Sequence, residues 1–239
     1  CRVKRPKWAF DKCVNAKKTL GTQMKATGEV MAISRSFECA LLKAMHSLEE
    51  NKKSILLPAY KNMSKDELLK LLPNIDNLRL YVVAASINAG IETEQIHDIT
   101  KIDMWFLDRI KNIVDAENQL STGVCNRETL LRAKKLGLTD DVIAENVGIP
   151  ESAVKSMRDM WNIKVSFSVV DTCAAEFAAE TPYYSSDYDV ENEVDAAPTG
   201  KKKVLVVGSG PIRIGQGIEF DYCSVHSVWA LKKAGCGTI

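Results

Sequence analysis

The chain has 239 residues, of which 46% are hydrophobic and 26% charged, with 13 glycines and 7 prolines. This ordinary composition excludes a collagen-like, low-complexity or largely disordered protein. With 32 basic against 31 acidic residues the net charge is +1, so we expect no nucleic-acid partner and no membrane partner. No apolar run approaches the roughly 20 residues of a membrane span, and the N-terminus lacks the apolar region of a signal peptide.

The seven cysteines and three histidines show no metal-binding spacing and no Cys-x-x-Cys pair, so we predict no metal site. Scattered cysteines usually act as small buried hydrophobic residues, which indicates a reducing, cytoplasmic location. Cys173 has no histidine near it in sequence, so a structural role is favoured over a nucleophilic one.

The first 28 residues carry eight basic side chains against Asp11 alone, a local net charge of +7. Such a run is typical of a solvated surface, and it also suits a surface that faces phosphates or an acidic partner.

Helical periodicity follows this basic run. Five apolar residues between 36 and 50 recur with the helical period: Phe37, Ala40, Leu41, Ala44 and Leu48. Ser64 and Glu67 have the spacing of a capping box at the start of the next helix. Further helices are predicted over residues 76–89, 93–100, from 103 onward, 126–137, 139–148 and 150–161. Residues 36–162 therefore predict a small helical domain of its own, rather than a β–α alternation.

The character of the chain changes after this helical stretch. Residues 165–171 look extended and β-branched, and residues 185–200 are predicted to be an acidic linker. The apolar run at 203–207 is typical of a buried parallel strand, followed by a helix over about 217–234 and the start of a second strand at Thr238. Because that β–α unit stops there, and the chain starts at Cys1 without a methionine, we expect a piece cut from a longer protein.

A glycine loop, Gly208-Ser-Gly-Pro-Ile-Arg-Ile-Gly-Gln-Gly217, lies between the strand at 203–207 and the helix after it. Backbone N–H groups in such a loop can meet an anion, although the loop can equally be fold architecture without a ligand. The third glycine comes five residues after the second, with a proline between them, so the loop is not the dinucleotide fingerprint.

Residues 139–158 have the spacing of a helix-turn-helix, with Ala144, Gly148 and Val154 at the small, turn and anchor positions. DNA binding requires basic side chains, yet residues 138–161 hold five acidic and two basic residues. We therefore predict the helix-turn-helix shape without the DNA-binding function. The Trp105-Phe106 pair is typical of a core, and it also suits a partner surface, so self-association is a further possibility.

The longest distinctive stretch is Gly208-Ser-Gly-Pro-Ile-Arg-Ile-Gly-Gln-Gly-Ile-Glu-Phe-Asp-Tyr222-Cys-Ser-Val-His226. It resembles the opening of the second synthetase half in large subunits of carbamoyl phosphate synthetases. Thr22-Gln-Met-Lys-Ala-Thr-Gly-Glu-Val-Met-Ala-Ile33 resembles the end of the first half. Ile102-Asp-Met-Trp-Phe-Leu107 and Val170-Asp-Thr-Cys-Ala-Ala-Glu-Phe177 are similar to the helical domain between the halves.

The resemblance implies a mainly α fold: a helical connecting domain flanked by partial α/β segments of ATP-grasp and pre-ATP-grasp type. It implies that residues 1–50 end the first, carboxyphosphate-forming half, 51–195 form the helical oligomerisation domain, and 196–239 begin the second, carbamoyl phosphate-forming half. The parent enzyme would be a ligase that makes carbamoyl phosphate from bicarbonate, glutamine-derived ammonia and two ATP, for arginine and pyrimidine biosynthesis.

The resemblance also implies ATP, Mg²⁺ or Mn²⁺, and K⁺ in the intact enzyme, with none bound by this chain, which should be inactive alone. No catalytic residue is assigned, because the family's ligands lie before Cys1 and after Ile239. Met24, Glu29, Gly217 and Glu219 match family segments near the carbamate passage and are candidate tunnel-lining residues. A small amidotransferase subunit or fused domain and a second copy of the chain are the expected partners.

The alternative is a non-catalytic helical assembly module.

Overall fold

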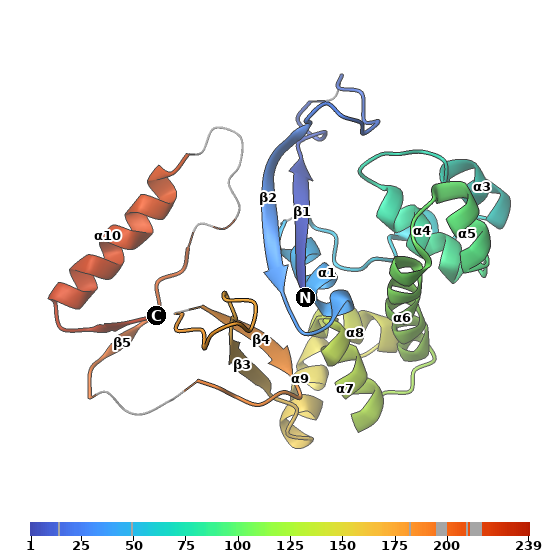
Figure 1. Cartoon of the computed structure of the whole chain (residues 1–239). Helices are drawn as coiled ribbons and strands as arrows, with labels where there is room; N and C mark the ends of the chain where they lie inside the picture. Colours follow the sequence, from blue (N-terminus) through green and yellow to red (C-terminus); the bar gives the residue numbers. More distant parts are fainter. Residues whose placement is uncertain (14, 49, 182, 195–199, 209, 211–216) are drawn as a thin grey trace.

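The computed structural model describes residues 1–13, 15–48, 50–181, 183–194, 200–208, 210 and 217–239. Most of the secondary-structure elements in these residues are helices, and the strands form three two-stranded sheets (Figure 1). β1 (Arg2–Trp8) pairs with β2 (Ala26–Ile33) and β3 (Val165–Val169) pairs with β4 (Tyr184–Tyr188), both antiparallel. β5 (Lys203–Val204) pairs with β6 (Gly237–Thr238) in parallel. The mainly α class expected from the sequence is confirmed.

The helices follow one another between these strands. Their bounds are α1 (Phe37–Ser47), α2 (Pro58–Lys61), α3 (Lys65–Leu71), α4 (Arg79–Asn88), α5 (Thr93–Thr100), α6 (Met104–Ser121), α7 (Arg127–Leu136), α8 (Asp140–Val147), α9 (Glu151–Met160) and α10 (Glu219–Lys233). The predicted capping box is present, since Ser64 and Glu67 satisfy each other's backbone N–H groups at the start of α3. Among the helices of the described residues, only the short α2 is not predicted from the sequence.

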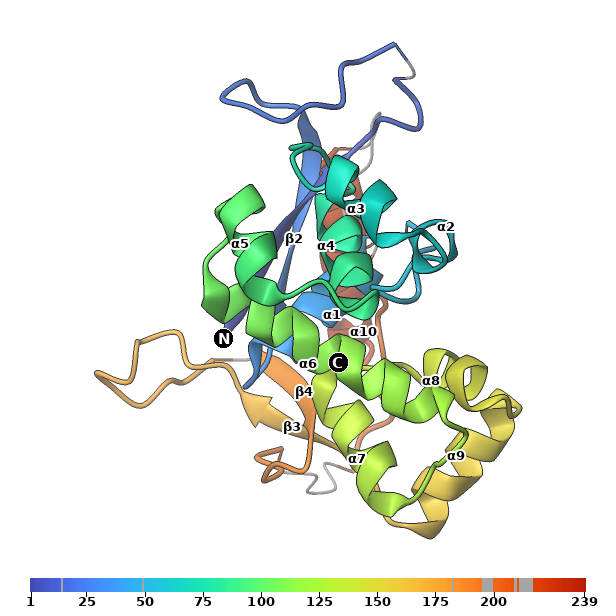
Figure 2. The same ribbon diagram turned by 90° about the vertical axis from the view of Figure 1, so that its right-hand side faces the viewer.

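The main core lies among helices α1 to α9. α6 is its central element and packs against α1, α4, α5, α7 and α8. The largest fully buried side chains of this core include Leu42, Leu72, Ile96, Leu107, Ile113, Leu130 and Leu138. Because Leu42 belongs to α1, that helix packs as part of the helical core. Figure 2 shows α4 and α6 in front of the hairpin β1–β2, with β3–β4 below them.

The basic N-terminal residues form the hairpin β1–β2, a structure that the sequence analysis does not predict. A second, small core lies between one face of this hairpin and α1, and consists of Val30, Ala32, Ala44 and Leu48. Arg5 faces the helices, is buried, and donates a hydrogen bond of 2.7 Å to the Tyr81 hydroxyl. The interpretation of the run as a solvated surface is therefore wrong for Arg5, because strand alternation turns every second side chain inward.

The prediction of a linker over 185–200 is wrong at its start. Residues Tyr184–Tyr188 form β4, which pairs with β3 along its whole length. Asp187 is buried in this strand through its polar contacts with Ser34 and Lys43, so the strand has no apolar alternation that the sequence could reveal. The acidic composition that indicates a linker therefore hides a strand. Residues 195–199 of the predicted linker lie outside the described residues.

The C-terminal unit has the predicted order of strand, helix and strand. Its apolar side chains stay exposed, however: Val207 is 80% accessible to solvent, and no residue of α10 is buried. A single parallel strand pair and one helix cannot enclose a core, so the apolar run at 203–207 is not buried by residues 203–239 alone, and the strand itself covers only Lys203–Val204. Figure 1 shows α10 standing apart from the helical domain.

Candidate functional site

The structure separates the four candidate tunnel residues into two pairs. Met24 and Glu29 lie on the hairpin, in the loop before β2 and in β2 itself, while Gly217 and Glu219 lie at the start of α10. Met24 is 82% exposed, and Glu29 is exposed and paired with Lys4 at 3.1 Å. The Gly217 N–H donates to the Glu219 carboxylate at 3.0 Å. Among the described residues, no hydrogen bond or ion pair joins the two pairs.

The glycine loop that the sequence analysis singles out can be followed only at its ends. Residues 209 and 211–216 lie outside the described residues, so the predicted anion contact has no structural description. Gly217 is half-buried, and Glu219 begins α10 as its first residue.

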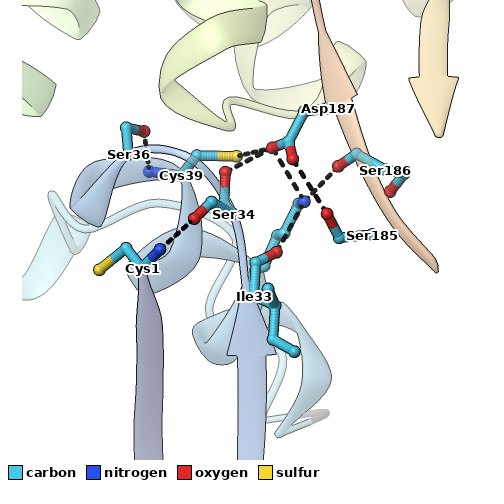
Figure 3. Close-up of polar contacts among 9 residues, drawn as sticks. Cys1, Ile33, Ser34, Ser36, Cys39, Ser185, Ser186 and Asp187 are labelled. Carbon is cyan, nitrogen blue, oxygen red and sulfur yellow. Dashed lines mark hydrogen bonds and ion pairs between the residues drawn. The ribbon is translucent and has the colours of Figure 1, made fainter. Parts of the chain in front are cut away.

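A buried polar junction joins the end of β2 to α1 and β4 (Figure 3). We call the set Ile33, Ser34, Lys43, Ser186 and Asp187 the Lys43 junction. The Lys43 ammonium donates to the Ile33 carbonyl and to the Asp187 carboxylate, both at 3.2 Å, and also to the Ser186 carbonyl. The Ser34 hydroxyl donates to the same Asp187 oxygen that accepts from Lys43.

The backbone around the junction is fixed by local signals. The Cys1 backbone nitrogen donates to the Ser34 carbonyl at 2.7 Å, which closes the hairpin beside the junction. The Ser36 hydroxyl accepts from the Cys39 N–H at 3.1 Å and so caps α1. This cap sets the start of α1 and thereby the turn on which Lys43 faces β4.

Cys39 lies against the same carboxylate, with its sulfur 3.6 Å from Asp187. Burial raises the pKa of the Cys39 thiol, an effect that outweighs the opposing hydrogen bond from Ser34 and the charge of Lys43. The thiol therefore stays protonated at neutral pH and can donate to the carboxylate. A protonated buried thiol is a weak nucleophile, so Cys39 is a structural donor.

The other side of β4 is held by α7. The Lys134 ammonium lies 5.1 Å from the centre of the Tyr188 ring, and Lys135 forms an ion pair with Asp189. Burial lowers the pKa of Lys134, while its 2.8 Å ion pair with Asp140 opposes that change. β4 is therefore bound on one side to β2 and α1, and on the other to α7.

The helix-turn-helix shape predicted for residues 139–158 is present in α8 and α9. Gly148 ends α8 with φ of +80°, and Val154 is fully buried. The structure describes all of residues 138–161, which include two basic side chains. One of them, Arg158, forms an ion pair with Asp140 at 2.7 Å, so its charge is neutralised within the domain.

A surface cavity of about 550 Å³ lies between the 51–62 segment, α6 and α8. The buried Glu117 carboxylate is part of its lining, and the single O–H of Ser54 donates to this carboxylate, with the hydroxyl oxygen 2.8 and 2.7 Å from the two carboxylate oxygens. Burial raises the pKa of Glu117, against the opposing effects of Ser54 and Lys61. We assign this carboxylate the role of anchoring the loop before α2, since its acceptors are directed at that loop.

Trp105 and Phe106 are not core residues, contrary to the first interpretation of that pair. Both are exposed, and each packs edge-on against Phe37, with ring centres 5.3 and 5.4 Å away. Arg109 lies 5.3 Å from the Trp105 ring and forms a 3.5 Å ion pair with the buried Glu38. The start of α6 therefore presents an aromatic surface with a cation beside it.

Across the described residues, no group of three histidine, cysteine or acidic side chains is arranged to hold a metal ion. The described helices include none that is long and apolar enough to cross a membrane.

Comparison with known proteins assigns the family. Residues 29–162, more than half of the chain, match the model described as carbamoyl-phosphate synthetase large chain, oligomerisation domain. The chain belongs to the carbamoyl-phosphate synthetase large-chain family. Residues 200–239 match a second model, the carbamoyl phosphate synthase preATP-grasp domain.

Curated relatives agree over the whole chain. The carbamoyl phosphate synthase large chain of Lachnoclostridium phytofermentans is 53% identical over 240 residues and covers 100% of this chain. Those of Agathobacter rectalis and Clostridium acetobutylicum are 49% and 47% identical over 239 residues, covering 100% and 99% of this chain. This chain spans 22% of the length of each of these relatives. The resemblance inferred from the motifs is confirmed.

Within this carbamoyl-phosphate synthetase family chain, the Lys43 junction is the feature that sequence reasoning missed. One signal was available: Lys43 is a charged residue in the middle of the otherwise apolar segment Cys39–Met45. Asp187 gave no comparable signal, because it stands among other acidic residues.

Proposed function

We propose that this chain is the central part of the large subunit of a glutamine-hydrolysing carbamoyl-phosphate synthase. That ligase would use bicarbonate, glutamine-derived ammonia and two ATP to make carbamoyl phosphate for arginine and pyrimidine biosynthesis. The single observation that carries the proposal is the end-to-end match to large chains at 47–53% identity. The test is expression of the full-length protein with its glutaminase and measurement of carbamoyl phosphate. Glutamine-dependent ATP consumption without that product would refute it.

The proposed role of the chain is to connect the two synthetase halves. Residues 1–50 would end the first ATP-grasp half, 51–195 would form the helical domain, and 196–239 would begin the second half. The exposed apolar surface of α10 and β5 supports this division, because it needs further strands and helices to cover it.

ATP, Mg²⁺ or Mn²⁺, and K⁺ would bind the parts of the enzyme that flank this chain. The described residues do not fit a metal, since they offer no three-ligand cluster. We therefore assign no catalytic step to them, and we expect the 239-residue chain alone to hydrolyse no ATP.

Met24, Glu29, Gly217 and Glu219 are proposed to line the carbamate passage. Their support is chemical: carboxylates and exposed backbone can hydrogen-bond water and a small labile anion. In the full-length enzyme, Glu219→Ala should raise the ATP consumed per carbamoyl phosphate formed, because carbamate would be lost. Asp221→Ala, two residues further along the same helix, is the matched control. An unchanged ratio in Glu219→Ala would remove this residue from the passage.

We further propose that the helical domain mediates self-association, and that the large subunit works with an amidotransferase subunit or fused domain in the cytoplasm. The exposed aromatic pair Trp105 and Phe106 supports an interface on α6, since aromatic residues and arginine are enriched in interfaces. The seven unpaired cysteines support a reducing compartment.

Self-association should be measured on residues 1–194, which avoid the exposed surface of α10. This portion keeps every buried apolar residue of the described structure, since these lie between Ala9 and Val170. Sedimentation velocity at rising concentration should show dimers or larger species. A strict monomer would refute the assembly role and the alternative of a purely non-catalytic assembly module.

A further inference from the structure

One ammonium group ties two consecutive elements, β2 and α1, to the strand β4, which is about 140 residues further along the chain. Lys43, in α1, donates to the Ile33 carbonyl at the last residue of β2. It also donates to the Ser186 carbonyl and the Asp187 carboxylate in β4. Figure 3 labels the three residues that supply these acceptors, Ile33, Ser186 and Asp187. An ammonium has three N–H donors, so all of its hydrogen bonds are used to join β2 with β4.

The carboxylate of the junction makes the matching set of contacts. Asp187 accepts from Ser34, just after β2, from Lys43 in α1, and from Ser185 in its own strand at 3.3 Å. The side chain of Asp187 is 7% exposed and that of Lys43 is 27% exposed. Removing either charge would leave the other one partly buried without its partner, so an intermediate, half-joined state is unfavourable.

The position of the junction gives it significance beyond stability. β1 and the start of β2 precede the oligomerisation-domain match at residues 29–162 and lie on the side of the proposed first half, whereas β4 lies between that match and the preATP-grasp match at residues 200–239. On its far side β4 is held by Tyr188 over Lys134 and by Asp189 with Lys135. A displacement of β2 must therefore either move β4 or break the junction.

We propose that Lys43 is a positioning residue that couples the two synthetase halves through β2 and β4. This proposal rests on the proposed function and identifies a contact that would position the two halves. In this reading the intact junction keeps the two halves in the relative position that lets carbamate from the first half reach the second. When the junction is broken, each half still performs its own chemistry, but carbamate is lost between them.

The experiment uses the full-length enzyme and separates the two halves by their partial reactions. The first half is followed by ATP hydrolysis with bicarbonate and no ammonia source, and the second by ATP formation from ADP and carbamoyl phosphate. Coupling is the ratio of ATP consumed to carbamoyl phosphate formed in the complete reaction. The variants are Lys43→Met, which keeps the length of the side chain, and Lys43→Arg, which keeps the charge. Lys111→Met, at an exposed ion pair with Asp115 on α6, is the matched control.

Lys43→Met should leave both partial rates within about twofold of the wild type while raising the ATP-to-product ratio at least about twofold. Lys43→Arg should restore most of the coupling, and Lys111→Met should not change it. A merely structural role would lower both partial rates together and leave the ratio unchanged, and that result would overturn the proposal. An unchanged ratio with unchanged partial rates would overturn it as well.

If Lys43→Met does not accumulate as folded enzyme, Asp187→Asn provides the second variant, since it keeps the volume and the acceptor oxygen but removes the charge. It must show the same rise in ratio with intact partial rates, and an unchanged ratio would refute the proposal. A wild-type enzyme that makes no carbamoyl phosphate would instead refute the proposed function, so the two failures are distinct.

Discussion

Removal of the Asp187 carboxylate is the sharpest test of how β4 is held. In Asp187→Ala, Lys43 loses its ion-pair partner and the Ser34 hydroxyl loses its acceptor. Loss of one member of a buried ion pair costs about 3–5 kcal/mol. Lys43 keeps two carbonyl acceptors and reaches water in part, which places the expected loss at the lower end, about 3 kcal/mol.

Two variants serve as references for this value. Asp187→Asn keeps an acceptor for Ser34 and Lys43 without the charge, so we expect a smaller loss of about 1–2 kcal/mol. Glu29→Ala removes an ion pair with Lys4 in which both side chains are largely exposed, and it should cost less than about 1 kcal/mol.

The assay is urea unfolding followed by circular dichroism, together with hydrogen exchange of the backbone amides. Because β3 and β4 form a two-stranded sheet of their own in the described structure, they can open without the helical core, and exchange detects such local opening. In Asp187→Ala the amides of β3 and β4 should exchange faster while those of α6 change less. If Asp187→Ala loses no more stability than Glu29→Ala, and β4 exchange is unchanged, the junction does not hold the strand.

Three further predictions test other parts of the chain. Gly137→Ala should lower the free energy of unfolding in urea by about 2–4 kcal/mol, because φ is +94° and the new Cβ would lie 3.0 Å from the Cys39 backbone. The control Gly123→Ala, which has a positive φ but open space around it, should lower it by only about 1–2 kcal/mol. The pKa of Glu117 is raised in the folded protein, so folding favours the protonated carboxyl, and the free energy of unfolding falls as the pH rises above 4.5, the ordinary pKa of a glutamate. Glu117→Gln should remove that part of the pH dependence when unfolding is measured at pH 4.5–8. Residues 138–161 should give no tight, salt-sensitive retention of DNA in filter binding at low salt.

The helical domain was predictable because its signals are local. Apolar periodicity, the Ser64 capping box and glycines such as Gly137 depend on residues within a few positions of one another. The helices of the structure begin and end close to the residues that these sequence signals indicate. The N-terminal hairpin was not predictable in the same way, because Arg5 and its neighbours are charged and the pairing partner lies about 25 residues away.

The candidate site shows the same limit more strongly. The four residues taken from the family resemblance keep their assignment as predictions, and within the described part of the chain no hydrogen bond or ion pair brings the two pairs together. The Lys43 junction, in contrast, joins residues separated by up to 153 positions, and no motif marks it. A lysine inside an apolar helix was a visible anomaly, yet its partner could be identified only once β4 was seen beside α1.

The polar character of this contact follows from where it lies. An apolar cluster between β4 and α1 would hold the strand by area alone, and such packing tolerates small shifts at little cost. An ammonium with three directed acceptors tolerates far less displacement, since hydrogen bonds weaken steeply with misalignment. Buried ion pairs are seldom superior to apolar packing in stability. The contact between Lys43 and Asp187 therefore fixes the relative position of β2 and β4 more closely than apolar packing would, which is the property that the proposed connection between two synthetase halves needs.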